Sequence, residues 1–469
     1  MAAILAASVT PVWRRGVLLV ANLAFFCTFA QGKTFASSAE SLIPFVAFLA
    51  FGYGAMLLVK SYKSSAIFWV ILAAMILGLC WLKRYAFFPQ ATLMSQWYSA
   101  IGLSYAFFRV VGLVIDAYQS VLPGRVNVAG YLNYTLNFTS FVSGPIELYK
   151  PFLRDEVEHP APLDRAAAGE ALRRIVVGFF KVTILSPLLA LAQQRSIEAS
   201  TAPLSYGMHL LDAALIVAIY PVFLFVNFSG YTDVVIGAAR FLRLELPENF
   251  NRPFLARGFL EFWNRWHMSL SNWFKTYVYS PLLLALMRRF PQRSIEPILG
   301  VIAYFVTFFL VGIWHGQTFM FVILGLLMGL GVSGNKLFQL QMVRALGRPG
   351  YQALCANRFY ASLTSGLTFL WLAAALVFMW APQEQIVALA RLFGPVTIVL
   401  AFLAIWAVAG AAYWVSTSID GAVDAIRTTR IWPAAFVLRP AWYAILAVVV
   451  VSVAVVLDAP APHLVYKAF

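Results

Sequence analysis

The chain has 469 residues, of which 62% are apolar and only 11% are charged, and its mean hydropathy is +0.80. These values exclude a soluble globular protein, whose apolar and charged fractions lie near about one half and one quarter, and they predict an all-α polytopic membrane protein. The formal net charge of +15 fits loop lysines and arginines that follow the positive-inside rule, and it favours contact with membrane lipids that carry anionic head groups. No basic tract or aromatic platform indicates nucleic-acid binding.

Apolar runs recur along the whole chain. They predict about ten or eleven membrane-spanning helices in a single integral-membrane domain over residues 1–469. The first run follows Arg14 and Arg15 without a small-residue cleavage site, so we expect an uncleaved helix. The runs lie near residues 17–31, 42–59, 66–82, 97–118, 175–192, 210–228, 277–287, 298–330, 360–380, 395–415 and 441–457.

One early segment, residues 131–145, is too polar to span a membrane and too apolar for water. Polar backbone at membrane depth is tolerated only where protein or a water-filled cavity surrounds it. We therefore expect Asn137 and Ser140 to line a central cavity.

Charged residues within apolar runs are few. Arg109 and Asp116 share a helix face, and interhelical pairing that neutralises their charges is the expected role.

A histidine-bearing segment follows the turn-like residues 247–253. Read as a helix, residues 261–273 place Trp263, Trp266 and His267 on one aromatic face. The sequence therefore predicts an amphipathic helix that presents His267. The alternative is an interfacial helix with a tryptophan belt, in which the histidine only caps or reaches towards the membrane surface.

The next uncharged run, residues 298–330, would measure roughly 50 Å as one helix, against a hydrocarbon core of about 30 Å. The segment from Gly312 to Gly316 is the expected break, because its two glycines loosen the helix. This places His315 deep in the bilayer, where an ionisable residue is a candidate for function. A neutral histidine that hydrogen-bonds between helices is the structural alternative.

A buried neutral imidazole is a competent proton acceptor. It suits removal of the proton from an alcohol that attacks an activated acyl group. The chain has no metal-spaced His/Glu motif, serine–histidine–carboxylate order, Gly-x-Ser-x-Gly elbow or phosphate-binding glycine loop. The scattered Cys27, Cys80 and Cys355 indicate neither disulfides nor a thiolate metal site. We expect no metal, no bound cofactor, and direct transfer from a thioester to a hydroxyl group.

Four motifs occur in order: SGYTD at 229–233, PENFNRPF at 247–254, EFWNRWHMSLS at 261–271 and GIWHG at 312–316. Together they resemble successive signatures of the membrane-bound O-acyltransferase (MBOAT) family. The resemblance is to its bacterial branch, which includes an alginate O-acetylation protein and a teichoic acid D-alanyl transfer protein. The motif core covers about residues 229–330.

The resemblance implies a ring of membrane-spanning, re-entrant and interfacial helices around a central tunnel. It implies that His315 matches the family's catalytic histidine, as general base, and that His267 lies in a second motif lining the same tunnel. Supporting residues are expected among Trp314, Gly316, Trp263, Arg265, Trp266, Ser269, Asn249, Asn251, Arg252, Asn137 and Ser140.

The function implied is transfer of a short acyl group, most simply acetyl, from a cytoplasmic thioester towards an extracytoplasmic polysaccharide. The thioester donor would be acetyl-CoA or the acyl group on an acyl carrier protein. The protein would lie in the bacterial inner membrane, and its partner protein would be a periplasmic acetyltransferase. D-alanyl transfer to a cell-envelope polymer is the first alternative. A polysaccharide exporter or transporter and a structural subunit of a synthase are the alternatives of another class.

Overall fold

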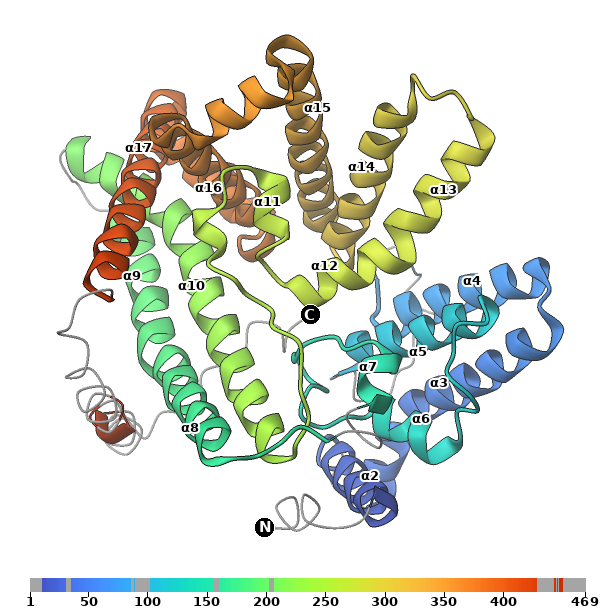
Figure 1. Ribbon diagram of the computed structural model, residues 1–469. Coiled ribbons are helices and arrows are strands. Elements are labelled where there is room, and N and C mark those ends of the chain that lie inside the picture. Colours follow the sequence, from blue (N-terminus) through green and yellow to red (C-terminus); the bar gives the residue numbers. More distant parts are fainter. Residues whose placement is uncertain are drawn as a thin grey trace. The chain divides into compact units, whose positions relative to one another are not determined.

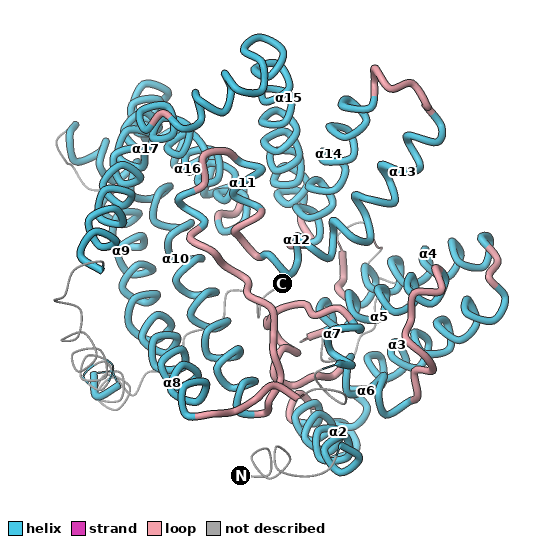
Figure 2. Tube along the Cα trace, in the orientation of Figure 1, coloured by secondary structure: helices cyan, strands magenta, loops and turns pink. Residues whose placement is uncertain are grey.

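The computed structural model describes residues 11–30, 35–85, 88, 102–154, 160–201 and 206–427, together with 443, 445 and 447–449 (Figures 1 and 2). In this part of the chain the secondary structure is helical, with no strand and one isolated β-bridge. The chain divides into two compact units: the described parts of residues 1–175 and 231–248 form the first, and those of 176–230 and 249–465 form the second.

Eight of the described helices are long and apolar enough to cross a membrane. This confirms the prediction of an all-α, multi-pass membrane protein. The run near 277–287 lies in a continuous helical stretch, residues 268–289, that is not among these candidate spans, whereas most of the run near 441–457 lies outside the described residues. The candidate spans are Ser37–Tyr62, Ser65–Leu82, Arg165–Ala199, Gly207–Phe241, Glu296–Trp314, Phe319–Ala356, Arg358–Trp380 and Gln383–Asp420.

The first unit is built around α5, whose side chains are almost all buried. Arg109 on this helix donates hydrogen bonds to the carbonyl oxygens of Thr135 and Ser140, at 3.1 Å each, so its buried charge meets main-chain dipoles. The unit contains α2 (Pro11–Cys27), α3 (Phe35–Tyr62), α4 (Ser65–Leu82), α5 (Leu103–Tyr118), α6 (Val128–Thr135), α7 (Tyr149–Leu153), the start of α8 (Arg165–Phe180) and the end of α10 (Tyr206–Phe241).

The second unit holds the remaining helices. Two of its long helices contain a kink at a glycine with positive φ, Gly347 in α15 and Gly394 in α17, and each glycine is followed closely by a proline. The unit contains the end of α8, residues 206–230 of α10, η3 (Lys181–Leu185), α9 (Ser186–Ala199), η4 (Pro253–Leu255), α11 (Phe259–Trp263), α12 (Met268–Phe274), η5 (Lys275–Tyr279), α13 (Ser280–Arg289), α14 (Glu296–Trp314), α15 (Phe319–Ala356), α16 (Arg358–Trp380) and α17 (Gln383–Arg427).

Helices α14 and α15 form an antiparallel hairpin whose turn lies at residues 315–318 (Figure 1). The two backbones cross closely, because a Cβ atom on Gly312 would lie 2.2 Å from the Cα atom of Gly325. Further along, the Ser333 hydroxyl donates to the Val301 carbonyl at 3.1 Å. The predicted break in the long apolar run is therefore confirmed. With 19 residues, α14 alone is about 28 Å long, and the depth of His315 in the bilayer stays a prediction.

Candidate active site

The segment around His267 is a turn between two short helices. Helix α11 ends at Trp263 and α12 begins at Met268, so the predicted continuous amphipathic helix over 261–273 is wrong. Its backbone pairs instead with residues 249–251, through hydrogen bonds from Asn251 N to Arg265 O at 2.9 Å and from Met268 N to Asn249 O at 3.0 Å. This pairing replaces the helical hydrogen bonds across the turn.

His267 is held in this turn by its backbone and by a neighbouring amide. Its φ of +43° is in the left-handed region, which a non-glycine residue adopts only when its surroundings enforce it. The side-chain oxygen of Asn249 accepts hydrogen bonds from the Ser269 N–H at 3.1 Å and from the Ser269 hydroxyl at 2.6 Å. Asn249 thus caps the start of α12.

The same Asn249 oxygen lies 3.4 Å from Nδ1 of His267. The Ser269 N–H can only donate, so the oxygen of the amide must face it, and this oxygen can only accept from His267. The arrangement favours the neutral tautomer that carries its proton on Nδ1 and presents Nε2 as the proton acceptor.

Aromatic rings enclose His267, which is 1% exposed. Its ring lies edge to face with Phe228 at 4.8 Å, and Phe250 contacts both Phe228 and Trp266 at 5.1 Å. Burial lowers the pKa of His267 well below its ordinary value of 6.5, and nearby His315 lowers it further. The imidazole is therefore neutral at pH 7.

His315 directly follows α14 and is also buried. The ring of Trp314 lies 4.7 Å from its ring. The next residue, Gly316, has no room for a side chain, because a Cβ atom there would lie 2.1 Å from the Phe321 ring. Close packing of the hairpin turn therefore fixes the backbone on both sides of His315.

Helix α11 contacts the hairpin through Trp263, whose ring lies 5.0 Å from that of Phe308 on α14. The indole N–H of Trp263 and the side-chain NH₂ of Asn249 are buried and have no hydrogen-bond partner among the described residues. Buried donors of this kind are rare in folded proteins and are available to a bound carbonyl or oxyanion.

A cavity of about 250 Å³ lies between α11, α12, η5 and α14. Trp263 and Met268 line it at the histidine-bearing turn. Its wall on α14 consists of Tyr304, Thr307, Phe308 and Val311, which share one helix face and lead along α14 towards the turn that carries His315. We refer to it as the α14 pocket.

Sequence reasoning missed this pocket. Its four positions on α14 have the i, i+3, i+4, i+7 spacing of one helix face. In a helix that is apolar on nearly every face, however, that spacing does not distinguish a cavity wall from a face packed in the core. Among the described residues, no group of three or more His, Cys, Asp and Glu side chains lies close enough to hold a metal.

Three of the predicted supporting residues lie on the outer side of the motif. Arg265 binds the carboxylate of Glu261, with Nη2 and Oε1 2.8 Å apart. Arg252 pairs with Asp420 on α17, and the side chain of Asn251 is exposed. The side chains of Arg265, Arg252 and Asn251 therefore do not contact either histidine among the contacts described. The residues that do pack or bond within the histidine-bearing segments are Asn249, Ser269, Trp263, Trp266, Trp314 and Gly316.

Asn137 and Ser140 belong to the first unit. The Ser140 hydroxyl accepts a hydrogen bond from Nη2 of Arg109 at 2.6 Å, and the Asn137 side-chain oxygen accepts from the Thr139 hydroxyl at 2.7 Å. Both side chains are buried and take part in hydrogen bonds within the first unit. Their role in lining a central cavity stays a prediction.

The family model described as MBOAT, membrane-bound O-acyltransferase family, matches residues 57–372, more than half of the chain and including both histidine-bearing segments. A teichoic acid D-alanyltransferase from Streptococcus thermophilus is 29% identical over 276 residues, which is 57% of this chain and 65% of that protein.

Other relatives give a similar result. A teichoic acid D-alanyltransferase from Bacillus subtilis is 29% identical over 274 residues, which is 58% of this chain and 66% of that protein. A probable alginate O-acetylase from Pseudomonas aeruginosa is 29% identical over 226 residues, which is 48% of this chain and 40% of that protein. The chain thus spans less than two thirds of the length of each of these relatives.

Proposed function

The chain belongs to the membrane-bound O-acyltransferase family, and from this premise we propose that it moves a short acyl group from a cytoplasmic thioester towards hydroxyl groups of an extracytoplasmic polysaccharide. The observation that carries the proposal is that two buried histidines share one unit with a pocket that leads along α14 towards the turn of His315. Family membership favours a transferase over an exporter or a structural synthase subunit.

In the proposed reaction, His315 takes the proton from the acceptor hydroxyl while its oxygen attacks the thioester carbonyl carbon. The tetrahedral intermediate then collapses, the carbon–sulfur bond breaks, and the imidazolium of His315 gives its proton to the leaving thiolate. The buried donors on Trp263 and Asn249 are suited to stabilise the oxyanion. His267, oriented by Asn249, positions or polarises a reactant.

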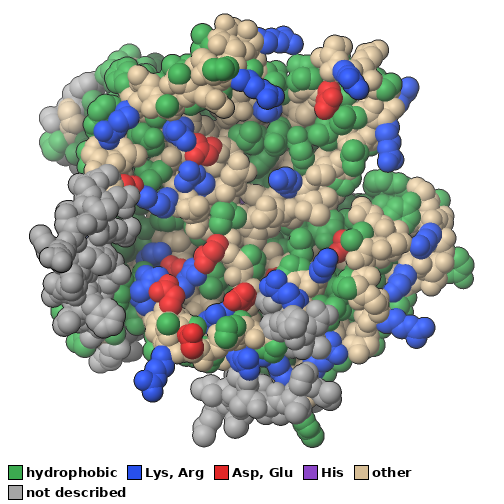
Figure 3. Space-filling view, viewed as in Figure 1, with side chains coloured by type: hydrophobic (Ala, Val, Ile, Leu, Met, Phe, Trp, Pro, Cys, Tyr) green, Lys and Arg blue, Asp and Glu red, His purple; other side chains and the backbone are tan. Residues whose placement is uncertain are grey.

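Charge supports entry of the donor along the α14 pocket. Basic residues collect at one end of the α13–α16 helices, which the positive-inside rule assigns to the cytoplasm. Figure 3 shows Lys and Arg side chains gathered over the ends of α13, α14 and α15. We call this the basic end, and its residues are Arg288, Arg289, Arg293, Lys336, Arg344, Arg348 and Arg358. The donor would be acetyl-CoA or an acyl carrier protein.

Acetyl is the first candidate for the acyl group, because alginate O-acetylases are among the relatives. D-alanyl is the second, because the teichoic acid D-alanyltransferases match a larger share of both chains. A periplasmic acetyltransferase that relays the acetyl group to the polymer is the proposed partner, and the bacterial inner membrane is the proposed location.

The test uses membranes that contain the full chain or its His315→Ala variant. They are incubated in parallel with isotope-labelled acetyl-CoA, acetyl carrier protein and D-alanyl carrier protein, together with candidate envelope glycans, and products are identified by mass spectrometry. We expect label in the glycan fraction with the wild type and one donor only, and none with the variant. Equal labelling by both proteins with every donor would contradict the proposal.

A further inference from the structure

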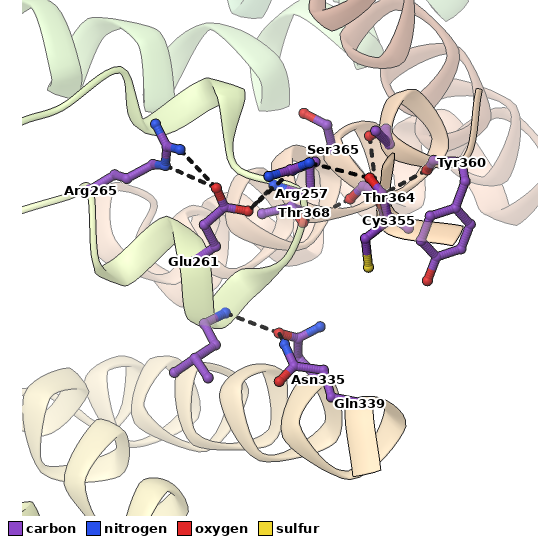
Figure 4. Close-up of polar contacts among 12 residues, drawn as sticks. Arg257, Glu261, Arg265, Asn335, Gln339, Cys355, Tyr360, Thr364, Ser365 and Thr368 are labelled. Atoms are coloured by element: carbon purple, nitrogen blue, oxygen red, sulfur yellow. Dashed lines mark hydrogen bonds and ion pairs between the residues drawn. The ribbon is translucent and has the colours of Figure 1, made fainter. Parts of the chain in front are cut away.

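The second unit contains another cavity, of about 690 Å³, between α11, α15 and α16 (Figure 4). It lies on a different side of α11 from the α14 pocket, since Phe259 and Glu261 line it, whereas Leu260 and Trp263 line the α14 pocket. The mechanism proposed above makes no use of it. We refer to it as the lateral cavity.

One end of the lateral cavity is polar and carries a net positive charge. The carboxylate of Glu261 pairs with two arginines: its Oε1 atom lies 2.8 Å from Nη2 of Arg265, and its Oε2 atom lies 3.7 Å from Nε of Arg257. One carboxylate between two guanidinium groups leaves one positive charge. Arg257 is further held by a hydrogen bond from Nη1 to the Cys355 carbonyl at 3.2 Å, and its side chain remains 45% exposed (Figure 4). This geometry leaves guanidinium N–H groups of Arg257 to bind an anion.

The rest of the cavity is apolar and opens sideways. Its lining includes Leu330 and Phe338 on α15 and Leu367 on α16, which are 52%, 40% and 54% exposed. Both helices are candidate membrane spans, so exposed apolar side chains on them face the hydrocarbon of the bilayer. The opening therefore admits a lipid chain more readily than water.

The cavity has the length of an extended acyl chain and a closed floor. Along α16 its lining runs from Tyr360 to Trp371, which corresponds to about 16 Å of helix. At the floor the three helices meet at Gly331, where a Cβ atom would lie 2.4 Å from the Trp371 indole nitrogen and 2.7 Å from the Phe259 ring.

The polar end faces the basic end of the helices. Between residues 336 and 358 the sequence has four basic side chains and no acidic one. The positive-inside rule assigns this end to the cytoplasmic leaflet, whose anionic lipids are attracted to such residues. We propose that the lateral cavity binds an anionic phospholipid of the bilayer, with its phosphate at Arg257 and one acyl chain between α15 and α16.

Gly334 provides a direct test, because it lines the cavity and a Cβ atom there meets nothing within 4 Å. In Gly334→Leu the new side chain should fill the cavity without disturbing the helix. Gly78→Leu on α4 is the matched control, because its Cβ also meets nothing within 4 Å. Should Gly334→Leu fail to fold, Leu367→Trp on the opening of the cavity is the second variant.

The full chain and its variants are reconstituted in nanodiscs of phosphatidylcholine with one fifth phosphatidylglycerol, extracted gently, and weighed with bound lipid by native mass spectrometry. We expect the wild type and Gly78→Leu to retain one phospholipid, with phosphatidylglycerol enriched about fivefold over the bulk. Gly334→Leu should lose it. Arg257→Gln should retain a lipid at the bulk composition, and added inorganic phosphate should not displace lipid from the wild type.

Three results would overturn the proposal. The first is equal lipid retention by the wild type, Gly334→Leu and Leu367→Trp. The second is unchanged phosphatidylglycerol enrichment in Arg257→Gln, because the headgroup would then not be recognised at that residue. The third is loss of acyl transfer by Gly334→Leu with lipid retention intact, because the cavity would then belong to the donor path.

Discussion

At the residue scale, the two histidines are held in different ways. His267 is fixed by a left-handed backbone, the Asn249 amide and the edge of Phe228. His315 ends a membrane helix beside Trp314 and is followed by a glycine that cannot carry a side chain. An imidazole whose Nδ1 faces a fixed amide is suited to orienting a reactant. This difference underlies the division of labour proposed for the two residues.

Substitution of His315 by glutamine should abolish acyl transfer. Glutamine keeps the approximate size and hydrogen bonding of histidine but cannot accept a proton at neutral pH. Loss of a general base slows a reaction by about 10²–10⁴. Turnover is measured with labelled donor in membranes, and thermal unfolding in detergent should match the wild type. Near-normal turnover would make His315 a structural hydrogen-bonding residue.

Substitution of His267 by alanine should leave residual activity. If the side chain positions a reactant through one hydrogen bond, its removal slows transfer roughly ten- to a hundredfold. The same labelled-donor assay measures this effect next to His315→Ala. A loss as complete as that of the His315 variant, in protein that unfolds at the wild-type temperature, would argue against separate roles.

At the element scale, the site depends on how closely α14 and α15 cross. In Gly312→Ala the new Cβ would lie 2.2 Å from the Cα and 2.5 Å from the N of Gly325, and a backbone atom cannot rotate away. We expect a destabilisation of about 1–3 kcal/mol from overpacking. Thermal unfolding in detergent measures it. Gly78→Ala, where the Cβ has open space, is the control and should unfold no earlier than the wild type.

A second prediction at this scale concerns the α14 pocket. Thr307 lines it, and its hydroxyl already donates to the Ala303 carbonyl of the same helix at 2.7 Å. Thr307→Phe should fill the pocket and raise KM for the thioester donor at least several-fold, with KM for the acceptor unchanged. Thr307→Val keeps the size of the side chain and should behave as the wild type. Steady-state kinetics with each substrate varied in turn measures both KM values. An unchanged KM for the donor in Thr307→Phe would show that the donor enters elsewhere.

The elements show which features the sequence could predict. The break at His315 followed from length and glycine, because an uncharged run of residues 298–330 cannot be one span. The turn at His267 was missed, because Trp263, Trp266 and His267 have helical spacing in the sequence. Backbone pairing with residues 249–251 overrides that spacing. It joins segments distant in sequence, so local periodicity carries no signal for it.

At the scale of the whole molecule, composition predicted the class of fold but not the partition of the chain. Residues 231–248 join the first unit although residues 176–230 and 249–465, on either side of them in the sequence, belong to the second. The hydrogen bond between Ser140 and Arg109 could likewise not be predicted from the sequence, because it joins residues that only the folded structure brings together. Membership of the membrane class follows from summed hydrophobicity, whereas such contacts depend on which helices pack together.

The charge distribution predicts the orientation of the second unit in the membrane. Two single-cysteine variants, Arg293→Cys and Gln383→Cys, test this orientation. Residue 293 is exposed in the connection between α13 and α14 at the basic end, and residue 383 is exposed at the start of α17, next to the opposite end of α16. In a background with Cys27, Cys80 and Cys355 changed to serine, an impermeant thiol reagent should label the cysteine at 383 in intact spheroplasts. The cysteine at 293 should be labelled only after permeabilisation. The reverse pattern would refute the proposed cytoplasmic entry of the donor.

The position of His315 directly after the last residue of α14 has an electrostatic consequence. The aligned peptide dipoles of a helix of 19 residues place a partial negative charge, about half an electron, at that end. When His315 takes the hydroxyl proton, the imidazolium forms beside these carbonyl groups, so its positive charge is stabilised only after the proton has moved. A cation at a partly buried helix C-terminus gains up to about 2 kcal/mol, a factor of roughly thirty in rate. The turn that interrupts the membrane span would then lower the barrier as well as locate the base.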